Sequence, residues 1–310
     1  MTRPNPSVMN IAIIGAGAIG SYYGARLSAA GHHVKFLLRS DYTHVWANGL
    51  EIRSIHGDFT LPEVQTFQYS EQIGEVDLVI LAWKTTSNQH AAEVITPLLG
   101  RETRILTLQN GLGNIEHLGA LFGMQRLLGG LCFVCINRIS PGVIHHSASG
   151  LIRIANADRP IDAYLQTLLT HFKHAGIRCE GIDDLEKALW MKLVWNFPFN
   201  GLAIAEGGVD TEVLLKQKNL EPLIRKLMHE VITVGRALGH DIPYTLIDQQ
   251  IAITHPMGPY KPSSMIDFVA AKPVEFDAIW KIPLSVALAQ QVEVPRMAEL
   301  TARIAKRLAH

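Results

Sequence analysis

The sequence predicts an α/β protein in two parts: an N-terminal unit built on a doubly wound, mostly parallel sheet, and a mostly helical C-terminal unit. Three observations predict this fold class. Short apolar runs alternate with helix-like stretches over the first half of the chain, as in parallel sheets covered by helices. Beyond residue 181 the pattern is almost purely helical. The length of 310 residues suits about two domains.

The expected elements of the first half follow one another in order. Strands are expected at residues 9–14, 34–38, 76–82 and 103–108, and helices at residues 19–30 and 88–99. Residues 51–66 alternate apolar and polar side chains around His56-Gly57-Asp58, which predicts a hairpin inserted in this series. The β-rich residues 127–155, with a turn at Pro141-Gly142, are expected to complete the sheet.

The second half reads differently. Helices are expected at residues 183–205, 221–238, 244–253 and 284–291. We therefore divide the chain near residue 182, into domains of residues 1–181 and 182–310.

The composition indicates a globular protein and excludes some partners. Hydrophobic residues make up 48% of the chain and charged residues 18%, which is not a disordered composition. Lys plus Arg equals Asp plus Glu, at 28 each, so no broad field favours nucleic acid or an anionic membrane. No segment resembles a membrane span. The few cysteines, Cys132, Cys135 and Cys179, suit a reducing compartment, so we expect a cytoplasmic protein.

Gly15-Ala16-Gly17-Ala18-Ile19-Gly20 is the strongest local motif. It follows a strand-like run and opens a helix-like one, the context in which G-x-G-x-x-G predicts dinucleotide binding. Gly15 permits the tight turn, Gly17 lets the pyrophosphate approach the backbone, and Gly20 lets the helix pack close to the strand. The first N–H groups of that helix then bind the phosphates. This predicts a Rossmann-like domain, with an ordinary glycine-rich turn as the alternative.

The end of the second strand bears on which dinucleotide binds. NAD binders usually carry Asp or Glu about 20 residues after the motif, where it bonds the ribose 2′-OH. Here the strand ends in Leu38-Arg39-Ser40, and Asp41 lies past the strand end. A guanidinium at Arg39 would pair with a 2′-phosphate, so the sequence favours NADP. The alternative for Arg39 is a solvated surface charge.

Lys84 and Asn110 are expected at the carboxyl ends of strands, where open α/β sheets bind ligands. Lys84 follows the run 79–83, and Asn110 follows the run 105–108. Lys84 offers a cation for a carboxylate or for cofactor oxygens, and Asn110 offers a donor and an acceptor without charge. The alternative for each is a turn residue or a surface charge.

Residues 189–200 form the most unusual stretch, because it is almost wholly apolar except for Lys192, Asn196 and Asn200. The i, i+4, i+8 spacing puts these three side chains on one face of a helix. A lysine among apolar groups tends to have a lowered pKa, which suits a proton donor near neutral pH. Pro198 is expected to kink or end the helix. The alternative is a lysine that reaches solvent beside two asparagines at a domain interface.

Two later polar clusters lie within a helical region. One contains Ser264 and the other contains Glu275. Glu275 could pair with a lysine or accept a hydrogen bond from a substrate hydroxyl, whereas either cluster on its own could be a helix cap.

Two further patterns are interpreted as structural. Cys132 and Cys135 stand in an apolar β-like run, where i and i+3 point to opposite faces, so we expect buried free cysteines rather than a redox pair. His32-His33 and His145-His146 lack partner ligands at metal spacing. No metal is therefore predicted.

Together these residues resemble the ketopantoate reductase family, the 2-dehydropantoate 2-reductases. The resemblance rests on GAGAIG, Lys84 in WKT, Asn110 in QNG, Lys192 in KLVWN, Ser264 in SSM and Glu275 in PVEFD. It spans nearly the whole chain, and the K-x-x-x-N-x-x-x-N helix is its most specific element. It implies a Rossmann domain, a helical domain and a cleft between them. It also implies NADPH-dependent reduction of a 2-keto acid to a 2-hydroxy acid in pantothenate synthesis.

The resemblance implies roles for individual residues. Lys192 would be the general acid that protonates the developing alkoxide, and Glu275 would support Lys192 and the substrate. The implied substrate-binding residues are Asn110, Lys192, Asn196, Asn200, Ser264 and Glu275. The implied cofactor-binding residues are Gly15, Ala16, Gly17, Ala18, Ile19, Gly20, Arg39, Lys84 and Asn110.

The chain departs from the family pattern around the expected substrate. Lys261-Pro262 stands where an Asn often precedes Ser-Ser-Met, and Trp280-Lys281 stands where Asn-Gly is usual. The helix that carries Lys192 continues as PFNGLAIAEGG, where the family commonly has an NPLTA-like sequence. The spacing from Met265 to Glu275 is one residue shorter than the family pattern. Two alternatives therefore stay open: a reductase of another 2-keto acid, and a non-catalytic NADP-binding sensor. The oligomeric state also stays open, with a homodimer among the alternatives.

Overall fold

The computed structural model describes residues 7–309, which fall into two compact units. Unit 1 consists of Met1–Gln109 and Asn114–Leu185, within the described range, and unit 2 of Asn110–Gly113 and Glu186–His310. The change of unit at Leu185 lies near the predicted boundary, but the short segment Asn110–Gly113 belongs to unit 2, which the sequence does not indicate. Across residues 7–309, no helix has the length and apolarity needed to cross a membrane.

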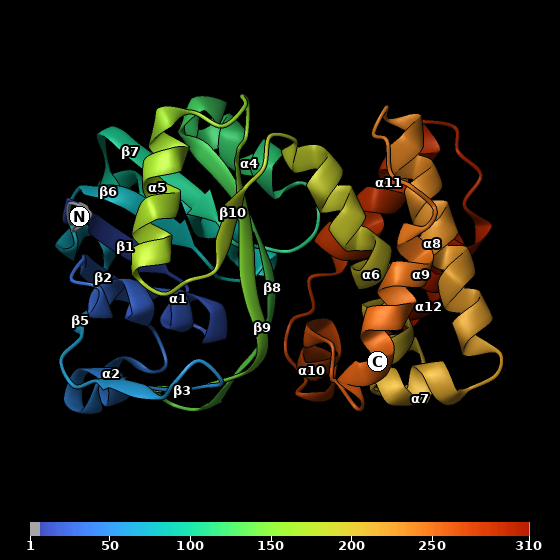
Figure 1. Cartoon of the computed structure of the whole chain (residues 1–310), viewed down its shortest axis with the longest axis horizontal. Coiled ribbons are helices and arrows are strands. Elements are labelled where there is room, and N and C mark those ends of the chain that lie inside the picture. The colour runs from blue at the N-terminus through green and yellow to red at the C-terminus, as the bar shows by residue number, and fades with distance from the viewer. Residues whose placement is uncertain (1–6, 310) are drawn as a thin grey trace, which may run out of the picture. The chain divides into compact units, whose positions relative to one another are not determined.

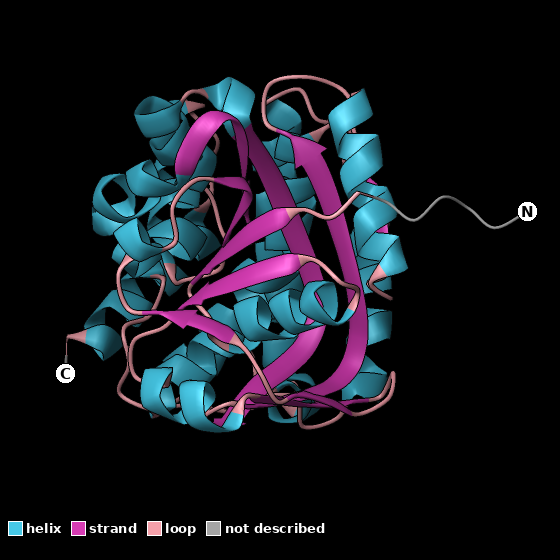
Figure 2. Cartoon of the chain, turned by 90° about the vertical axis from the view of Figure 1, so that its left-hand side faces the viewer, coloured by secondary structure: helices cyan, strands magenta, loops and turns pink. Residues whose placement is uncertain are grey.

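Unit 1 is built on one sheet, whose strands lie side by side in Figure 2 and, except for β4, are labelled in Figure 1. The strands are β1 (Asn10–Ile14), β2 (His33–Leu37), β3 (Leu50–Ser54), β4 (Phe59–Leu61), β5 (Gln65–Phe67), β6 (Val76–Leu81), β7 (Leu99–Thr107), β8 (Leu127–Ser140), β9 (Val143–Asn156) and β10 (Cys179–Gly181). Their order is β4-β3-β9-β8-β7-β6-β1-β2-β5, with β10 beside β9. Only the pairs β3–β4 and β8–β9 are antiparallel among them, so the predicted mostly parallel sheet is confirmed.

The two hairpins follow the sequence pattern with one correction. β8 and β9 form a long hairpin that turns at Pro141-Gly142, as predicted. The hairpin predicted over residues 51–66 is shorter, because β3 pairs with β4 only as far as Leu61. Residues Gln65–Phe67 instead pair in parallel with β2 at the opposite edge of the sheet.

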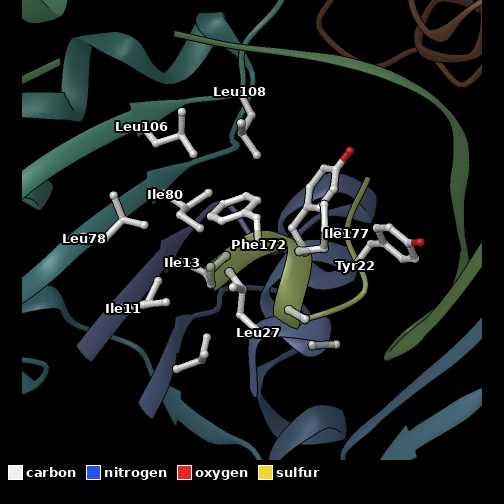
Figure 3. Packing of buried hydrophobic residues seen from close by; sticks show 14 of the residues in the cluster. Ile11, Ile13, Tyr22, Leu27, Leu78, Ile80, Leu106, Leu108, Phe172 and Ile177 are labelled. Atoms are coloured by element: carbon white, nitrogen blue, oxygen red, sulfur yellow. The ribbon is translucent and has the colours of Figure 1, made fainter. Parts of the chain in front are cut away.

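The helices of unit 1 cover both faces of the central strands. They are α1 (Ala18–Ala29), α2 (Tyr42–Asn48), α3 (Ala91–Ile95), α4 (Asn114–Phe122) and α5 (Ala163–His174). Ile11 and Ile13 of β1 pack in the cluster shown in Figure 3 with residues of α1 and with Phe172 of α5. The intervening Ala12 and Ile14 are also fully buried. Because alternate side chains of a strand point to opposite faces, β1 is covered on both sides, as expected for a parallel sheet.

Unit 2 is helical, and no residue between 182 and 309 lies in a strand. Its helices are α6 (Leu185–Ala205), α7 (Thr211–Lys216), α8 (Leu220–Ala237), α9 (Leu246–Thr254), α10 (Ser263–Val269), a π-helix (Asp277–Lys281), α11 (Ile282–Ala289) and α12 (Pro295–Leu308). α6 packs its apolar side chains into the core of this unit. It continues through Pro198, so the proline does not end the helix, although it is a residue that a helix interior usually excludes.

Candidate active site

The glycine motif forms the turn between β1 and α1 in unit 1. Gly15 has φ +87°, and a Cβ built on it would lie 2.2 Å from the backbone nitrogen of Trp83. A Cβ on Gly20 would lie 2.4 Å from the carbonyl oxygen of Gly15. Gly17 differs from both, because it is exposed and a Cβ there would meet nothing within 4 Å. Two glycines thus let the chain close tightly, and the third leaves open space over the turn.

The other motif residues build the start of α1. Ala18 begins the helix after Gly17, and Ser21 closes the turn, since its Oγ donates to the carbonyl oxygen of Ala16 at 2.9 Å. Ile19 is partly buried against the core. The open side over Gly17 and the first turn of a helix together fit a pyrophosphate.

The loop after β2 carries the residues expected to choose the dinucleotide. Arg39 is exposed at this strand end. Asp41 is buried at the N-cap of α2, and its Oδ1 accepts hydrogen bonds from Arg138 Nη1 at 2.6 Å and from Ser40 Oγ at 2.9 Å. The sequence did not indicate Arg138, which lies far along the chain on β8.

Lys84 follows β6 and is partly buried at the start of a 3-10 helix. A polar network that the sequence did not indicate fixes the strand ends around it. Gln109 Nε2 donates to Asn88 Oδ1 at 2.7 Å and to the carbonyl oxygen of Trp83 at 3.2 Å. Trp83 Nε1 donates to the same Asn88 oxygen at 3.0 Å. The turn containing Lys84 is therefore held by side chains from both β6 and β7 ends.

In unit 2 the structure brings Lys192 and Asn110 together. Lys192 Nζ donates to Asn110 Oδ1 at 2.8 Å, and both residues are partly buried. An ammonium can only donate, so this bond requires that Asn110 present its oxygen. Bonds from a charged donor are among the stronger hydrogen bonds, and the contact fixes where the lysine nitrogen lies.

The backbone holds Asn110 in place. The N–H of Leu112 donates to the carbonyl oxygen of Ala278 at 2.9 Å. Gly111 has φ +81°, and a Cβ there would lie 2.3 Å from that oxygen. The segment thus needs glycine at 111 both for its conformation and for its close approach to residue 278.

Lys192, Asn196 and Asn200 share one face of α6, as predicted, but they make different hydrogen bonds. Asn200 Nδ2 donates to the carbonyl oxygen of Asn196 at 3.1 Å, and its Oδ1 accepts from the backbone N–H of Ser264 at 3.1 Å. Asn200 and Ser264 are buried, whereas Asn196 is partly buried. Asn200 therefore ties the start of α10 to α6.

Glu275 is buried, with 8% of its surface exposed, two residues before the start of the π-helix at Asp277. Its carbonyl oxygen accepts from the N–H of Ile279 at 3.2 Å. Trp280, in the same segment, is fully buried, and its Nε1 donates to the carbonyl oxygen of Phe197 in α6 at 3.0 Å. The Trp280 departure from the family pattern is thus a core contact with the helix that carries Lys192.

The cysteines and the paired histidines are the remaining patterns interpreted as structural. Cys132, Cys135 and Cys179 form no disulfide. Cys132 and Cys135 are only partly buried, so the prediction of buried cysteines is met only in part by these two. Both residues lie in the middle of β8, between its buried first residues and its exposed last residues. His32 and His171 pack against each other in the core, with ring centroids 4.9 Å apart.

Comparison with known proteins gives one consistent result. The family description "Ketopantoate reductase PanE/ApbA" matches residues 11–159, and "Ketopantoate reductase PanE/ApbA C terminal" matches residues 184–307. A 2-dehydropantoate 2-reductase from Nostoc sp. is 36% identical over 92% of this chain and 91% of that protein. The crystal structure of 2-dehydropantoate 2-reductase from Geobacter metallireducens GS-15 is 41% identical, with a TM-score of 0.93 over 96% of this chain and 99% of that one.

The fold is also shared more widely. A D-mandelate dehydrogenase solved with NADH and anilino(oxo)acetate has a TM-score of 0.90 at 21% identity, covering 97% of this chain and 99% of that one. At this identity the likeness concerns the fold alone. The matches over both halves of the sequence, together with the 36% and 41% identical relatives, show that this chain belongs to the ketopantoate reductase family.

Proposed function

We propose that this protein is an NADPH-dependent 2-dehydropantoate 2-reductase, which reduces ketopantoate to pantoate in pantothenate and coenzyme A biosynthesis. The observation that carries the proposal is the Lys192–Asn110 hydrogen bond of 2.8 Å in unit 2. It would hold Lys192, the proposed proton donor, at a fixed position on α6. The names of the Nostoc and Geobacter relatives support the same activity.

The cofactor belongs to unit 1 in this proposal. The open space over Gly17 and the start of α1 would receive the pyrophosphate of the cofactor. Lys84 would lie near cofactor oxygens that are farther from the glycine turn. When bound, the nicotinamide supplies the hydride. NADP is favoured over NAD because Arg39 is exposed at the end of β2, while the nearby Asp41 is already paired with Arg138. An acid so paired is a poor acceptor for a ribose 2′-OH.

Lys192 would act as the general acid. Reduction of the keto carbon leaves negative charge on its oxygen. The N–H bond of the Lys192 ammonium then breaks as the O–H bond of the product forms, and the neutral lysine regains a proton from solvent. Such general acid catalysis typically contributes about 10²–10⁴ in rate. A charged donor also stabilises the transition state more than the neutral ketone, and Asn110 would keep that donor aimed.

The remaining polar residues of unit 2 would bind the substrate's hydroxyl and carboxylate groups. We assign this role to Asn196 and Ser264, and a supporting role beside Lys192 to Glu275. Both polar atoms of the Asn200 amide bond within the protein. Asn200 would therefore act on the substrate through the position of Ser264 and α10.

The alternatives are a reductase of another 2-keto acid and a non-catalytic NADP sensor. The first rests on departures from the family pattern, and one of these, Trp280, is a buried residue that donates to the backbone of α6. Lys261-Pro262 remains a difference directly before α10. The second alternative has no use for a lysine held in register by an asparagine.

The test is NADPH consumption by purified protein over a panel of 2-keto acids, with NADH as a second reductant. The proposal predicts the highest kcat/KM for ketopantoate with NADPH, and a large loss in Lys192→Ala. Lys226→Ala, an exposed lysine on α8, is the matched control and should match wild type. A higher kcat/KM for another acid would favour the first alternative. Tight NADPH binding without any turnover would favour the sensor.

We further propose a cytoplasmic location, which the lack of a disulfide among the three cysteines supports. Sedimentation equilibrium decides between a monomer and the homodimer that the sequence leaves open.

A further inference from the structure

We propose that Arg138 is a second residue that recognises the 2′-phosphate of NADP, and that Asp41 positions it. The inference rests on the proposed NADPH preference, which otherwise depends on Arg39 alone. It starts from the ion pair between Arg138 Nη1 and Asp41 Oδ1, which are 2.6 Å apart.

The sheet topology explains why a β8 residue reaches the loop after β2. That loop leads through α2 into β3, and β3 pairs in parallel with β9, with Glu51 opposite Val143. β9 pairs with β8, which places Arg138 opposite Ile144. The outer end of the β8–β9 hairpin is therefore joined to the segment that follows Arg39. Asp41, two positions after Arg39, receives the Arg138 guanidinium.

The two partners of the ion pair are buried to different extents. The Asp41 side chain is 7% exposed, whereas that of Arg138 is 35% exposed. The carboxylate thus faces the protein, where Ser40 Oγ also donates to it. Arg138 is the exposed partner of the pair. Although the pair is formally neutral, its cationic member is therefore the more accessible one to a ligand near Arg39.

This arrangement suits a phosphate monoester. A guanidinium carries five N–H donors in a planar fork, so the bond to Asp41 leaves capacity for phosphate oxygens, which Arg binds in a bidentate manner. Such a phosphate carries about −1.5 to −2 charges at pH 7, which two cations neutralise better than one. Asp41 would otherwise repel it, and Arg138 removes that repulsion.

An ion pair that only stabilises the hairpin is the competing explanation, and the chain offers a matched control for it. Arg153 of β9 pairs with Glu180 of β10 at 3.1 Å, with 39% of the Arg153 side chain exposed. It lies on the same hairpin with similar exposure, but in the part of β9 that pairs with β10 and not in the part that pairs with β3. Arg153→Met should therefore leave cofactor selectivity unchanged.

The experiment measures the Kd of 2′,5′-ADP and of 5′-AMP, and the KM of NADPH and of NADH, for wild type, Arg138→Met, Arg153→Met and Arg39→Met. Loss of a hydrogen bond to a charged group corresponds to about 10- to 100-fold in affinity. Arg138→Met should therefore raise the Kd of 2′,5′-ADP and the KM of NADPH by about that factor. Binding of 5′-AMP and the KM of NADH should stay within about twofold, since neither carries the phosphate that this residue contacts.

The positioning role of Asp41 has its own readout. In Arg138→Met the Asp41 carboxylate keeps the hydrogen bond from Ser40 Oγ but loses its cationic partner, so its negative charge repels the phosphate. Adding Asp41→Asn to that variant should therefore recover part of the lost 2′,5′-ADP affinity, a coupling that a double-mutant cycle measures. Arg138→Lys should retain an intermediate affinity, because a lysine keeps the charge without the fork.

The outcomes separate this inference from the proposed cofactor preference. If Arg39→Met weakens 2′,5′-ADP binding while Arg138→Met equals Arg153→Met, the inference is overturned and the NADPH preference stands. Equal weakening of 2′,5′-ADP and 5′-AMP in Arg138→Met would also overturn it. A wild-type protein that binds 5′-AMP as tightly as 2′,5′-ADP would overturn both.

Discussion

Lys192 on α6 and Asn110 beyond the end of β7 are 82 residues apart in sequence, yet Lys192 Nζ donates to Asn110 Oδ1 at 2.8 Å. Asn110 is itself held by the neighbouring contact between Leu112 and Ala278. Catalytic groups must be held close to their productive geometry. Asn110 should therefore be needed to hold the Lys192 ammonium in its productive position.

Replacing Asn110 should change the rate and its pH dependence. Asn110→Ala removes a bond to a charged group, so kcat should fall by about 10- to 100-fold. Asn110→Asp places a carboxylate beside the ammonium, which favours the charged lysine. The pH above which kcat declines should then move upward relative to wild type. A pH profile of Asn110→Asp that superimposes on the wild-type profile would contradict the proton-donor role of Lys192.

Gly17 and Gly20 should separate cofactor binding from stability. A side chain at Gly20 collides with the Gly15 carbonyl oxygen, whereas one at Gly17 enters open space. Gly20→Ser should therefore cost about 1–3 kcal/mol of stability. Gly17→Ser should unfold like wild type, because serine is a favoured N-cap residue, but should bind NADPH more weakly. Thermal unfolding and NADPH fluorescence titration measure the two effects, and unimpaired NADPH binding by Gly17→Ser would argue against the proposed pyrophosphate position.

Asn200 should be a stability residue of unit 2. Asn200→Ala leaves the N–H of the buried Ser264 without its acceptor, and an unsatisfied buried group costs about 1–3 kcal/mol. Urea unfolding measures this loss. Asn48→Ala is the control, since the Asn48 amide also donates to a backbone carbonyl but is exposed, and it should change stability by less than about 0.5 kcal/mol. Equal effects of the two changes would refute the structural role.

His32 should make unit 1 sensitive to acid. Burial, with His171 close by, lowers the pKa of His32 from 6.5 to about 4. The folded protein then keeps this ring neutral between those values, while the unfolded chain takes up a proton. The contribution of His32 to the free energy of unfolding is therefore fully present above pH 6.5. It falls as the pH drops towards 4, by at most about 1.4 kcal/mol per pH unit.

His32→Gln tests this pH dependence. Glutamine retains an acceptor for the N–H of Met9, which bonds His32 Nδ1, but it does not titrate. The free energy of unfolding measured from pH 7.5 to 4.5 should fall less steeply in His32→Gln than in wild type. His255→Gln, at an exposed position, should keep the wild-type slope. Parallel curves for wild type and His32→Gln would rule out the role of His32.

The sequence predicted the features that depend on local pattern. The strand β1, the glycine turn and the face shared by Lys192, Asn196 and Asn200 follow from short-range periodicity. The transfer of Asn110–Gly113 to unit 2 and the pairing of Arg138 with Asp41 depend on contacts between residues far apart in the chain. Periodicity carries no information about such contacts.

At Pro198 the local sequence signal and the observed helix disagree. Its local preference is against a helix interior, yet α6 continues through it. α6 is packed among apolar side chains of unit 2, and Trp280 donates to its backbone at Phe197. Tertiary packing thus overrides the local signal at this residue.

The most direct test of the account is product formation by wild type and Lys192→Ala at saturating ketopantoate and NADPH. Pantoate formed and NADPH oxidised are measured in the same reaction. Wild type should form one pantoate per NADPH oxidised. Lys192→Ala should be slower by a factor of about 10²–10⁴ and should bind NADPH as tightly as wild type. NADPH oxidation without pantoate, or a Lys192→Ala variant as fast as Lys226→Ala, would contradict the account.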